Sequence, residues 1–135
     1  MFDAKVQAVM DRVDRVRDEV SDHWQIPREE AELLAQLVRL GRCRSLCEIG
    51  TSYGYSTLHL TAAAAEHGGF VHAVERDPRK VQLTRDHLAE AGLSDHAEVH
   101  EGDAREAGAG PSPAEPFDFA FIAAEKRESF AHLDV

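Results

Sequence analysis

The sequence predicts an α/β domain whose core is a parallel sheet. From residue 45 onward, short apolar runs alternate with helix-length segments, and a two-glycine turn follows the first run. Alternation of this kind is typical of a parallel sheet, because a crossover helix must return the chain to the same end. Right-handed crossovers place the first strand centrally, with its carboxyl end at the switch point where ligands bind. A chain of 135 residues has the size of one domain with a single core.

Two helices are predicted before the first strand. Valines recur at spacings of three and four residues, with charged residues between them, at Val6, Val9, Val13, Val16 and Val20. They predict an amphipathic helix over residues 2–20, whose apolar stripe requires a partner surface. Pro27 opens a second helix that ends at Gly41, with a predicted inward face of Leu33, Leu34, Leu37, Val38 and Leu40. We expect these helices to form a cap or an oligomer contact.

The remaining elements follow in order along the chain. Strands are predicted at residues 45–49, 70–74, 97–100 and 117–122, and helices at residues 55–66 and 78–91. Asp77 and Pro78 favour the start of the second of these helices, and Gly92 favours its end. Apart from Glu115, residues 107–116 are Gly, Ala, Pro and Ser, which predicts a flexible surface connection.

The segment that links the first strand to its helix is the most informative part of the chain. Residues 48–57 are Glu-Ile-Gly-Thr-Ser-Tyr-Gly-Tyr-Ser-Thr. Glycines permit positive φ angles and close approach of a ligand, while the helix start presents unpaired N–H groups to an anion. Glu75 follows the second apolar run, where a carboxylate can bind the two hydroxyls of a ribose. The pattern therefore predicts a nucleotide-cofactor loop.

Other interpretations of this loop differ in the residues that they require. A P-loop needs a lysine after its second glycine, but Tyr55 follows Gly54 here. A dinucleotide fingerprint, as in a nicotinamide oxidoreductase, needs a middle glycine near the position that Ser52 occupies. The plainest alternative is that Gly50 and Gly54 only turn the chain in an unrelated α/β protein.

Composition disfavours several classes of protein. The chain has 25 acidic and 15 basic residues, and a net charge of −10 repels a phosphate backbone, so we expect no nucleic-acid partner. No apolar run approaches ~18 residues and the amino terminus is rich in Asp and Arg, so we expect a cytoplasmic protein without membrane contact. Cys43 and Cys47 are expected to stay reduced and structural. The eight histidines lack the spacing of a zinc-binding helix, and the sequence predicts no metal site.

Four segments, in order along the chain, carry a resemblance to a known family. They are residues 48–56, Glu75, the Glu-Gly-Asp-Ala run at 101–104, and the Phe-Ala-Phe-Ile run at 119–122 that leads to Lys126. Together they resemble class I S-adenosylmethionine-dependent O-methyltransferases of the catechol and caffeoyl-coenzyme A type. The resemblance implies a Rossmann-like methyltransferase fold with strand order 3-2-1-4, the remaining strands being absent. Residues 1–41 would be a helical cap and residues 42–135 the cofactor-binding half.

The resemblance also implies how individual residues would hold S-adenosylmethionine. Glu48 would accept from the cofactor's ammonium group, and Ser56 would donate to its carboxylate. Glu75 would hold both ribose hydroxyls, because a carboxylate offers two oxygens at a matching separation. The implied set is Glu48, Gly50, Thr51, Gly54, Ser56 and Glu75, with Asp103 and Ala104 at the adenine edge. Without the family, Glu75 would be an exposed carboxylate in a turn and Asp103 a helix N-cap.

The implied reaction is transfer of the sulfonium methyl group to a hydroxyl oxygen of a small molecule. Lys126 matches the family's catalytic lysine. A lysine in a desolvated pocket can act as a general base, because burial lowers its pKa. The alternative is a solvated lysine within the charged run at residues 125–128.

Two features depart from the family's pattern. The family has a magnesium-binding aspartate directly after the fourth strand, where this chain has Ala123, and Glu125 lies two positions further on. A divalent metal is therefore doubtful. The chain also stops at Val135, inside a predicted helix, which leaves the fourth strand as an exposed edge. We expect a fragment of an enzyme, with a half-domain completed by another chain as one alternative.

A different class of function remains open beside the enzyme. A catalytically inactive remnant would be a cofactor-binding or assembly module. Such a module would join a partner, or a second copy in a homodimer, through its valine-striped first helix or the bare edge of the sheet.

Overall fold

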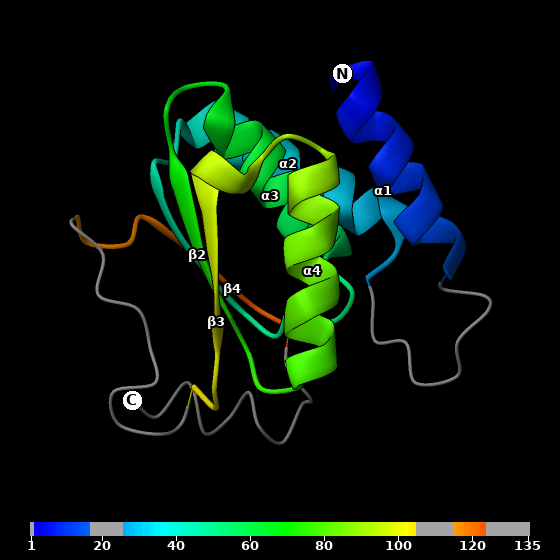
Figure 1. Ribbon diagram of the computed structural model, residues 1–135. Helices are drawn as coiled ribbons and strands as arrows, with labels where there is room; N and C mark the ends of the chain where they lie inside the picture. The colour runs from blue at the N-terminus through cyan, green and yellow to red at the C-terminus, as the bar shows by residue number, and fades with distance from the viewer. Residues whose placement is uncertain (1, 17–25, 105–114, 124–135) are drawn as a thin grey trace.

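A four-stranded parallel sheet supports the helices of the protein, for which a computed structural model describes residues 2–16, 26–104 and 115–123. The strands are β1 (Ser45–Ile49), β2 (Phe70–Glu75), β3 (Ala97–Glu101) and β4 (Phe119–Ile122). Their order is β3-β2-β1-β4, and every neighbouring pair is parallel. This confirms the predicted order, with β1 in the interior of the sheet (Figure 1).

Four α-helices lie on one side of this sheet (Figure 1). They are α1 (Ala4–Val16), α2 (Arg28–Gly41), α3 (Tyr55–Ala65) and α4 (Pro78–Glu90), and a short 3₁₀ turn, η1 (Ser94–His96), precedes β3. Helix α1 packs against α3 and α4. Within the described ranges, the opposite face of the sheet carries no helix. None of the described helices combines the length and the apolar character that a membrane span requires.

Helix α3 is the central helix of the core. Residues 55–64 are all buried, because α1, α2, α4 and β2 surround the helix. Its Leu, Ala and Thr side chains suit an environment that is dry on every side, and Leu58 and Leu60 are fully buried. The loop that precedes α3 is thereby joined to a fully packed helix.

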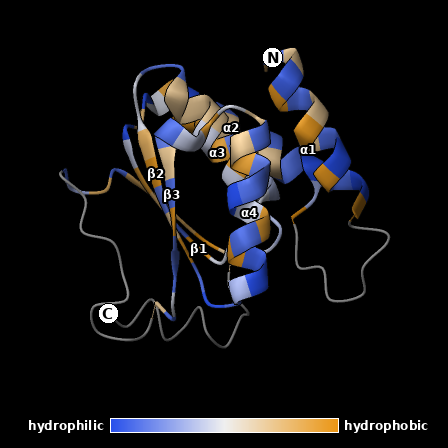
Figure 2. Ribbon diagram, in the orientation of Figure 1, coloured by the Kyte–Doolittle hydropathy of each residue, from blue (hydrophilic) through white to orange (hydrophobic). Residues whose placement is uncertain are grey.

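The valine stripe of α1 is buried against the chain's own helices. Val6, Val9 and Val13, with Met10, join a cluster that includes residues of α3 and α4. Figure 2 shows α1 and α4 alternating between hydrophilic and hydrophobic colours along their length, as expected for helices with one buried face. The partner surface that the stripe requires is therefore intramolecular, while Val20 lies outside the described residues.

The predicted inward face of α2 is wrong for three of its leucines. Leu33, Leu37 and Leu40 are 58%, 46% and 82% exposed, whereas Ala31, Ala35 and Val38 are buried. These small residues recur at spacings of four and three, so they form one face on which α2 can approach α3 closely. The bulkier leucines lie on the outer side, except for Leu34, which is partly buried against the core.

Candidate cofactor-binding site

The loop between β1 and α3 adopts a conformation that its glycines make possible. Gly50 and Gly54 have φ angles of 88° and 92°, and the Gly50 N–H donates to the carbonyl of Val74 at 2.8 Å. A side chain at residue 54 would also be crowded by Thr84, whose Cγ2 would lie 3.0 Å from the added Cβ. Gly54 is thus required both by its backbone angles and by the close approach of α4.

Glu48 lies at the end of β1 and is fully buried. Its two carboxylate oxygens accept hydrogen bonds from the hydroxyls of Ser56 and Thr57, in the first turn of α3. Burial raises the pKa of Glu48 from 4.5 to about 7, while the two hydroxyl donors act in the opposite direction and the charge of Glu75 adds to the rise. A cation that binds beside Glu48 would lower this pKa, and the carboxyl group would then be fully ionised at neutral pH.

Glu75 ends β2 and is held in place by the backbone on both sides. Its Oε1 accepts from the N–H of Ser52 at 3.1 Å, and its Oε2 accepts from the N–H of Asp77 at 2.9 Å. The side chain therefore joins the glycine loop to the turn before α4, and only 9% of the residue is exposed. Each oxygen keeps a second lone pair for a further donor.

Thr51 and Thr84 tie the loop to α4. Their hydroxyl oxygens lie 3.1 Å apart, and the Thr84 hydroxyl also donates to the carbonyl of Ser52 at 3.2 Å. The Thr51 side chain is thus turned toward the protein interior. Ser52 has a positive φ of 51°, and its Oγ is buried with no hydrogen-bond partner among the described residues.

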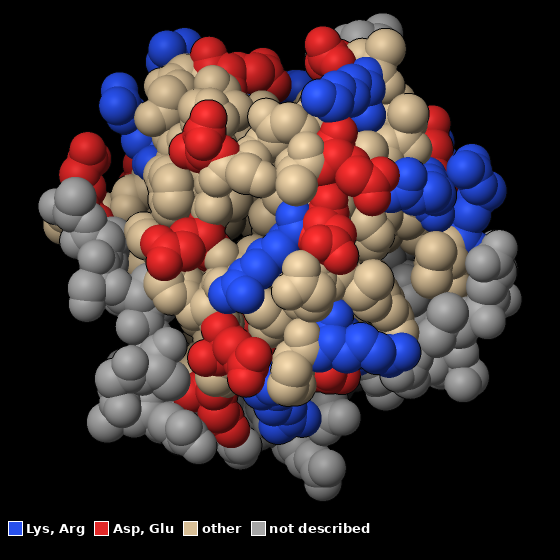
Figure 3. All heavy atoms as spheres, viewed as in Figure 1, with Lys and Arg blue, Asp and Glu red and all other residues tan. Residues whose placement is uncertain are grey.

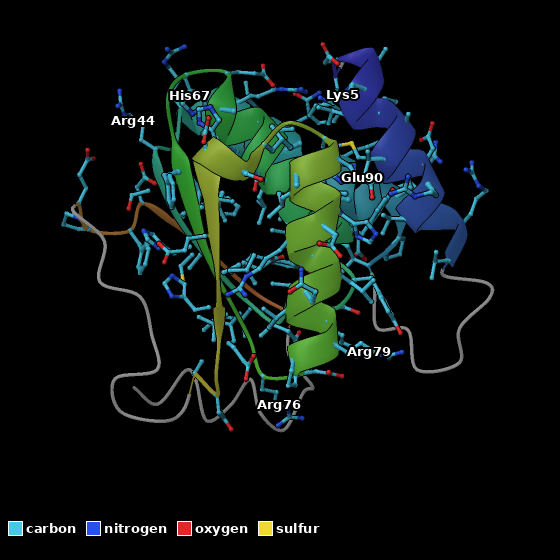
Figure 4. The ribbon with its side chains drawn as sticks, in the orientation of Figure 1. Lys5, Arg44, His67, Arg76, Arg79 and Glu90 are labelled. Atoms are coloured by element: carbon cyan, nitrogen blue, oxygen red, sulfur yellow. The ribbon has the colours of Figure 1, made fainter. Side chains whose placement is uncertain are left out.

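The residues after β3 lie next to the end of β2. Glu75 is in register with Glu101, and its carbonyl accepts from the N–H of Gly102 at 3.0 Å. Asp103 and Ala104 follow directly and are half-buried. The sheet therefore brings the ends of β1, β2 and β3, with their predicted site residues, to one edge. Figure 4 places Arg76 and Arg79 at this same end of the molecule.

The remaining predicted positions lie after β4. The Ala123 N–H donates to the carbonyl of Ile49 at 2.8 Å, so residue 123 reaches the carboxyl edge of the sheet without a side-chain oxygen to offer. Lys126 and Glu125 lie outside the described residues.

Sequence reasoning missed three residues that shape this site. Thr57 shares the Glu48 carboxylate with Ser56, Thr84 supports the loop from α4, and Ser52 contributes the unpaired hydroxyl. The role of Thr57 becomes visible only when the first turn of α3 is placed beside the Glu48 carboxylate. In the sequence, Ser56 and Thr57 are simply adjacent polar residues. Thr84 lies on another helix, and no local pattern connects it to the loop.

Comparison with known proteins finds several curated relatives. The chain is 35% identical over 107 residues to tricin synthase 1 from Oryza sativa subsp. japonica, covering 73% of this chain and 41% of the relative. It is 33% identical over 119 residues to catechol O-methyltransferase from Mycobacterium tuberculosis, covering 84% of this chain and 53% of the relative. The chain thus spans about half the length of these curated relatives.

Solved structures resemble the fold along nearly the whole chain. An O-methyltransferase from Bacillus cereus, solved with SAH, superposes with a TM-score of 0.78 at 28% identity, covering 98% of this chain and 59% of the other. The O-methyltransferase TomG from Streptomyces achromogenes, solved with SAM, gives 0.79 at 26% identity, covering 93% and 57%. A family model described as O-methyltransferase matches residues 4–134, a range that contains every element of the sheet and its helices. The resemblance seen in the sequence is therefore confirmed, and the chain belongs to the O-methyltransferase family.

Proposed function

We propose that this protein is an S-adenosylmethionine-dependent methyltransferase that acts on a hydroxyl oxygen of a small molecule in the cytoplasm. The observation that carries the proposal is the Glu75 carboxylate, fixed by two backbone N–H groups beside a loop with two left-handed glycines. Structural relatives solved with SAM and SAH support the choice of cofactor.

Three features of the described residues fit such a cofactor. Each Glu75 oxygen retains a lone pair that can accept a hydrogen bond from a ribose hydroxyl. An apolar ligand without hydroxyl groups would leave both acceptors unused. The buried Ser52 Oγ lacks a partner, and a buried hydroxyl without one is costly unless a ligand or water satisfies it. The positive φ at Gly50 and Gly54 lets the backbone lie close to the bound molecule.

Glu48 would receive the cofactor's ammonium group. Because an opposite charge favours the ionised carboxylate, the cation would lower a pKa that burial has raised to about 7. Ser56 and Thr57 hold the carboxylate in one orientation. For Ser56 to donate to the cofactor's carboxylate instead, its hydroxyl must turn away from Glu48, which Thr57 would continue to bind. Thr51, Asp103 and Ala104 complete the proposed set, the last two at the adenine edge.

The bound cofactor supplies an activated methyl group, so the protein's task is to position the acceptor and remove its proton. Lys126 is our proposed general base, on the strength of the family's motif alone. No step in this proposal uses a metal, because Ala123 has no side-chain ligand atom where the family has an aspartate. The catechol O-methyltransferases among the relatives make catechol a suitable acceptor probe.

Isothermal titration calorimetry with S-adenosylhomocysteine tests the cofactor assignment. We expect binding by the full chain, and Glu75→Ala should weaken it about tenfold to a hundredfold, since a hydrogen bond to a charged group contributes about 1.5–3 kcal/mol. Glu90→Ala is the matched control, because this glutamate lies at the far end of α4 and pairs with Arg12 at 2.7 Å (Figure 4).

Two outcomes would contradict the cofactor assignment. Equal affinity in the wild-type chain and Glu75→Ala would remove Glu75 from the site. A folded wild-type chain that gives no heat with either S-adenosylmethionine or S-adenosylhomocysteine would overturn the proposal altogether.

A further inference from the structure

A cluster of two histidines and a glutamate lies away from the cofactor loop, on the face of the sheet that carries no described helix. His72 is in the middle of β2, and Glu98 and His100 are on β3. The register pairs His72 with Glu98 and Val74 with His100. Since alternate residues of a strand point to the same face, the three side chains project together, opposite to Val71 and Ala73 of the helix-covered core.

The ligand atoms of this cluster are already close to one another. His72 Nδ1 and His100 Nε2 lie 3.2 Å apart, and His100 Nε2 lies 3.9 Å from Glu98 Oε2. All three ligand atoms lie within 4.8 Å of one another. Zinc binds imidazole nitrogen at about 2.0–2.1 Å in a tetrahedron, which places neighbouring ligand atoms about 3.3 Å apart. The histidine pair meets that spacing without moving, and only the glutamate must shift.

The surroundings fix the histidines and leave the glutamate adjustable. The His72 ring contacts the rings of Phe70 and Phe117, with centroids 4.9 and 6.1 Å away, and stacks on His100 at 5.5 Å. The Glu98 side chain is 59% exposed, so it can close the remaining distance at little cost in packing.

The protonation state of His72 also suits metal binding. Burial lowers its pKa, and the neighbouring His100 adds to the effect, although Glu98 acts in the opposite direction. A lower pKa favours the neutral imidazole, which is the form that coordinates a metal. The simplest competing arrangement is a plain hydrogen bond between two neutral rings, which the 3.2 Å separation also permits.

We propose that His72, His100 and Glu98 form a binding site for a zinc-like transition-metal ion, with a fourth position open to water. Two nitrogens and one oxygen suit zinc and its neighbours rather than magnesium or calcium, which prefer ligand sets made of oxygen. The spacing of histidines along the sequence did not indicate this site, because the ligands come from two strands that only the sheet brings together. None of the proposed cofactor-binding residues takes part in it.

Titration of the full chain with zinc chloride alone, in metal-free buffer, tests the site. We expect one ion per chain, and His72→Ala and His100→Ala should each raise the Kd about tenfold or more. Glu98→Gln should raise it by a smaller factor, and this exposed change leaves the core intact if either histidine variant fails to fold. Magnesium chloride should give no saturable binding.

His67→Ala is the matched control. This histidine is also partly buried, but its Nε2 lies 2.6 Å from the carbonyl oxygen of Cys43, near the end of the sheet where β1 and β2 begin (Figure 4). Its loss should leave zinc affinity unchanged. No binding by the wild-type chain would overturn the proposal in favour of the hydrogen-bonded pair, and so would equal zinc affinity in wild type, His100→Ala and Glu98→Gln.

Discussion

At the scale of single residues, two buried glutamates at the edge of the sheet have different hydrogen-bond partners. Glu48 is fully buried, and its pKa is raised to about 7. Glu75 accepts two backbone N–H bonds, which hold its side chain in a fixed position. One side chain can therefore respond to a cation, while the other presents a preformed pair of acceptors. Both appear in the sequence only as an acidic residue at the end of an apolar run.

Glu48 makes the stability of the chain depend on pH. Because its pKa is about 7 in the folded chain and near 4.5 when unfolded, the folded chain binds the additional proton between these values. The free energy of unfolding should therefore fall as pH rises through this window, by about 3 kcal/mol, and level off above pH 7. Glu48→Gln should remove this contribution, as urea unfolding at pH 5 and pH 8 would measure.

Glu90→Gln serves as the control for this measurement, because the Glu90 side chain is 48% exposed. It should retain the pH dependence of the wild-type chain. If Glu48→Gln lost as much stability between the two pH values as the wild type, the buried carboxyl would not be the group responsible.

At the scale of elements, α2 shows how packing decides which face of a helix is buried. Its leucines and its small residues both recur at helical spacing, so hydrophobicity alone favours the leucine face. The fold buries Ala31, Ala35 and Val38 instead, because α2 lies close against α3. By contrast, α1 has a single apolar face, and its buried residues were predictable.

A pair of substitutions on α2 measures this difference. Val38→Ala should lower the free energy of unfolding by about 2 kcal/mol, since it removes two methyl groups from a fully buried position. Leu40→Ala removes a larger side chain that is 82% exposed and should change stability by less than about 0.5 kcal/mol. Urea denaturation of both variants gives the comparison, and a larger loss for Leu40→Ala would contradict the orientation of the helix.

At the scale of the whole molecule, all the described helices lie on one side of the sheet, and the proposed cofactor site lies at its carboxyl edge. Figure 3 shows acidic and basic side chains interspersed on the viewed face. The valine stripe is already buried within the chain, so the homodimer expected from the sequence stays a prediction that would need another surface.

Methyl transfer to the catechol probe should not depend on a divalent metal. Ala123 reaches the edge of the sheet without a ligand oxygen, so a chelator should leave turnover unchanged. Lys126→Ala should lower turnover about a hundredfold or more, as expected for loss of a general base. Labelled methyl transfer measures both, with Arg44→Ala as a control at the opposite end of the sheet (Figure 4). Strong inhibition by the chelator would show that the protein has a catalytic metal site.

The sequence by itself determined the alternation of strands and helices, the interior position of the first strand and the glycine loop, because these depend on local patterns and on the handedness of crossovers. The full order of the sheet was predicted from the family resemblance. Only the tertiary structure decided which face of α2 is buried, that Thr57 and Thr84 support the loop, and that His72, Glu98 and His100 meet. Those outcomes depend on contacts between elements, and neither the spacing of residues nor their local propensity specifies such contacts.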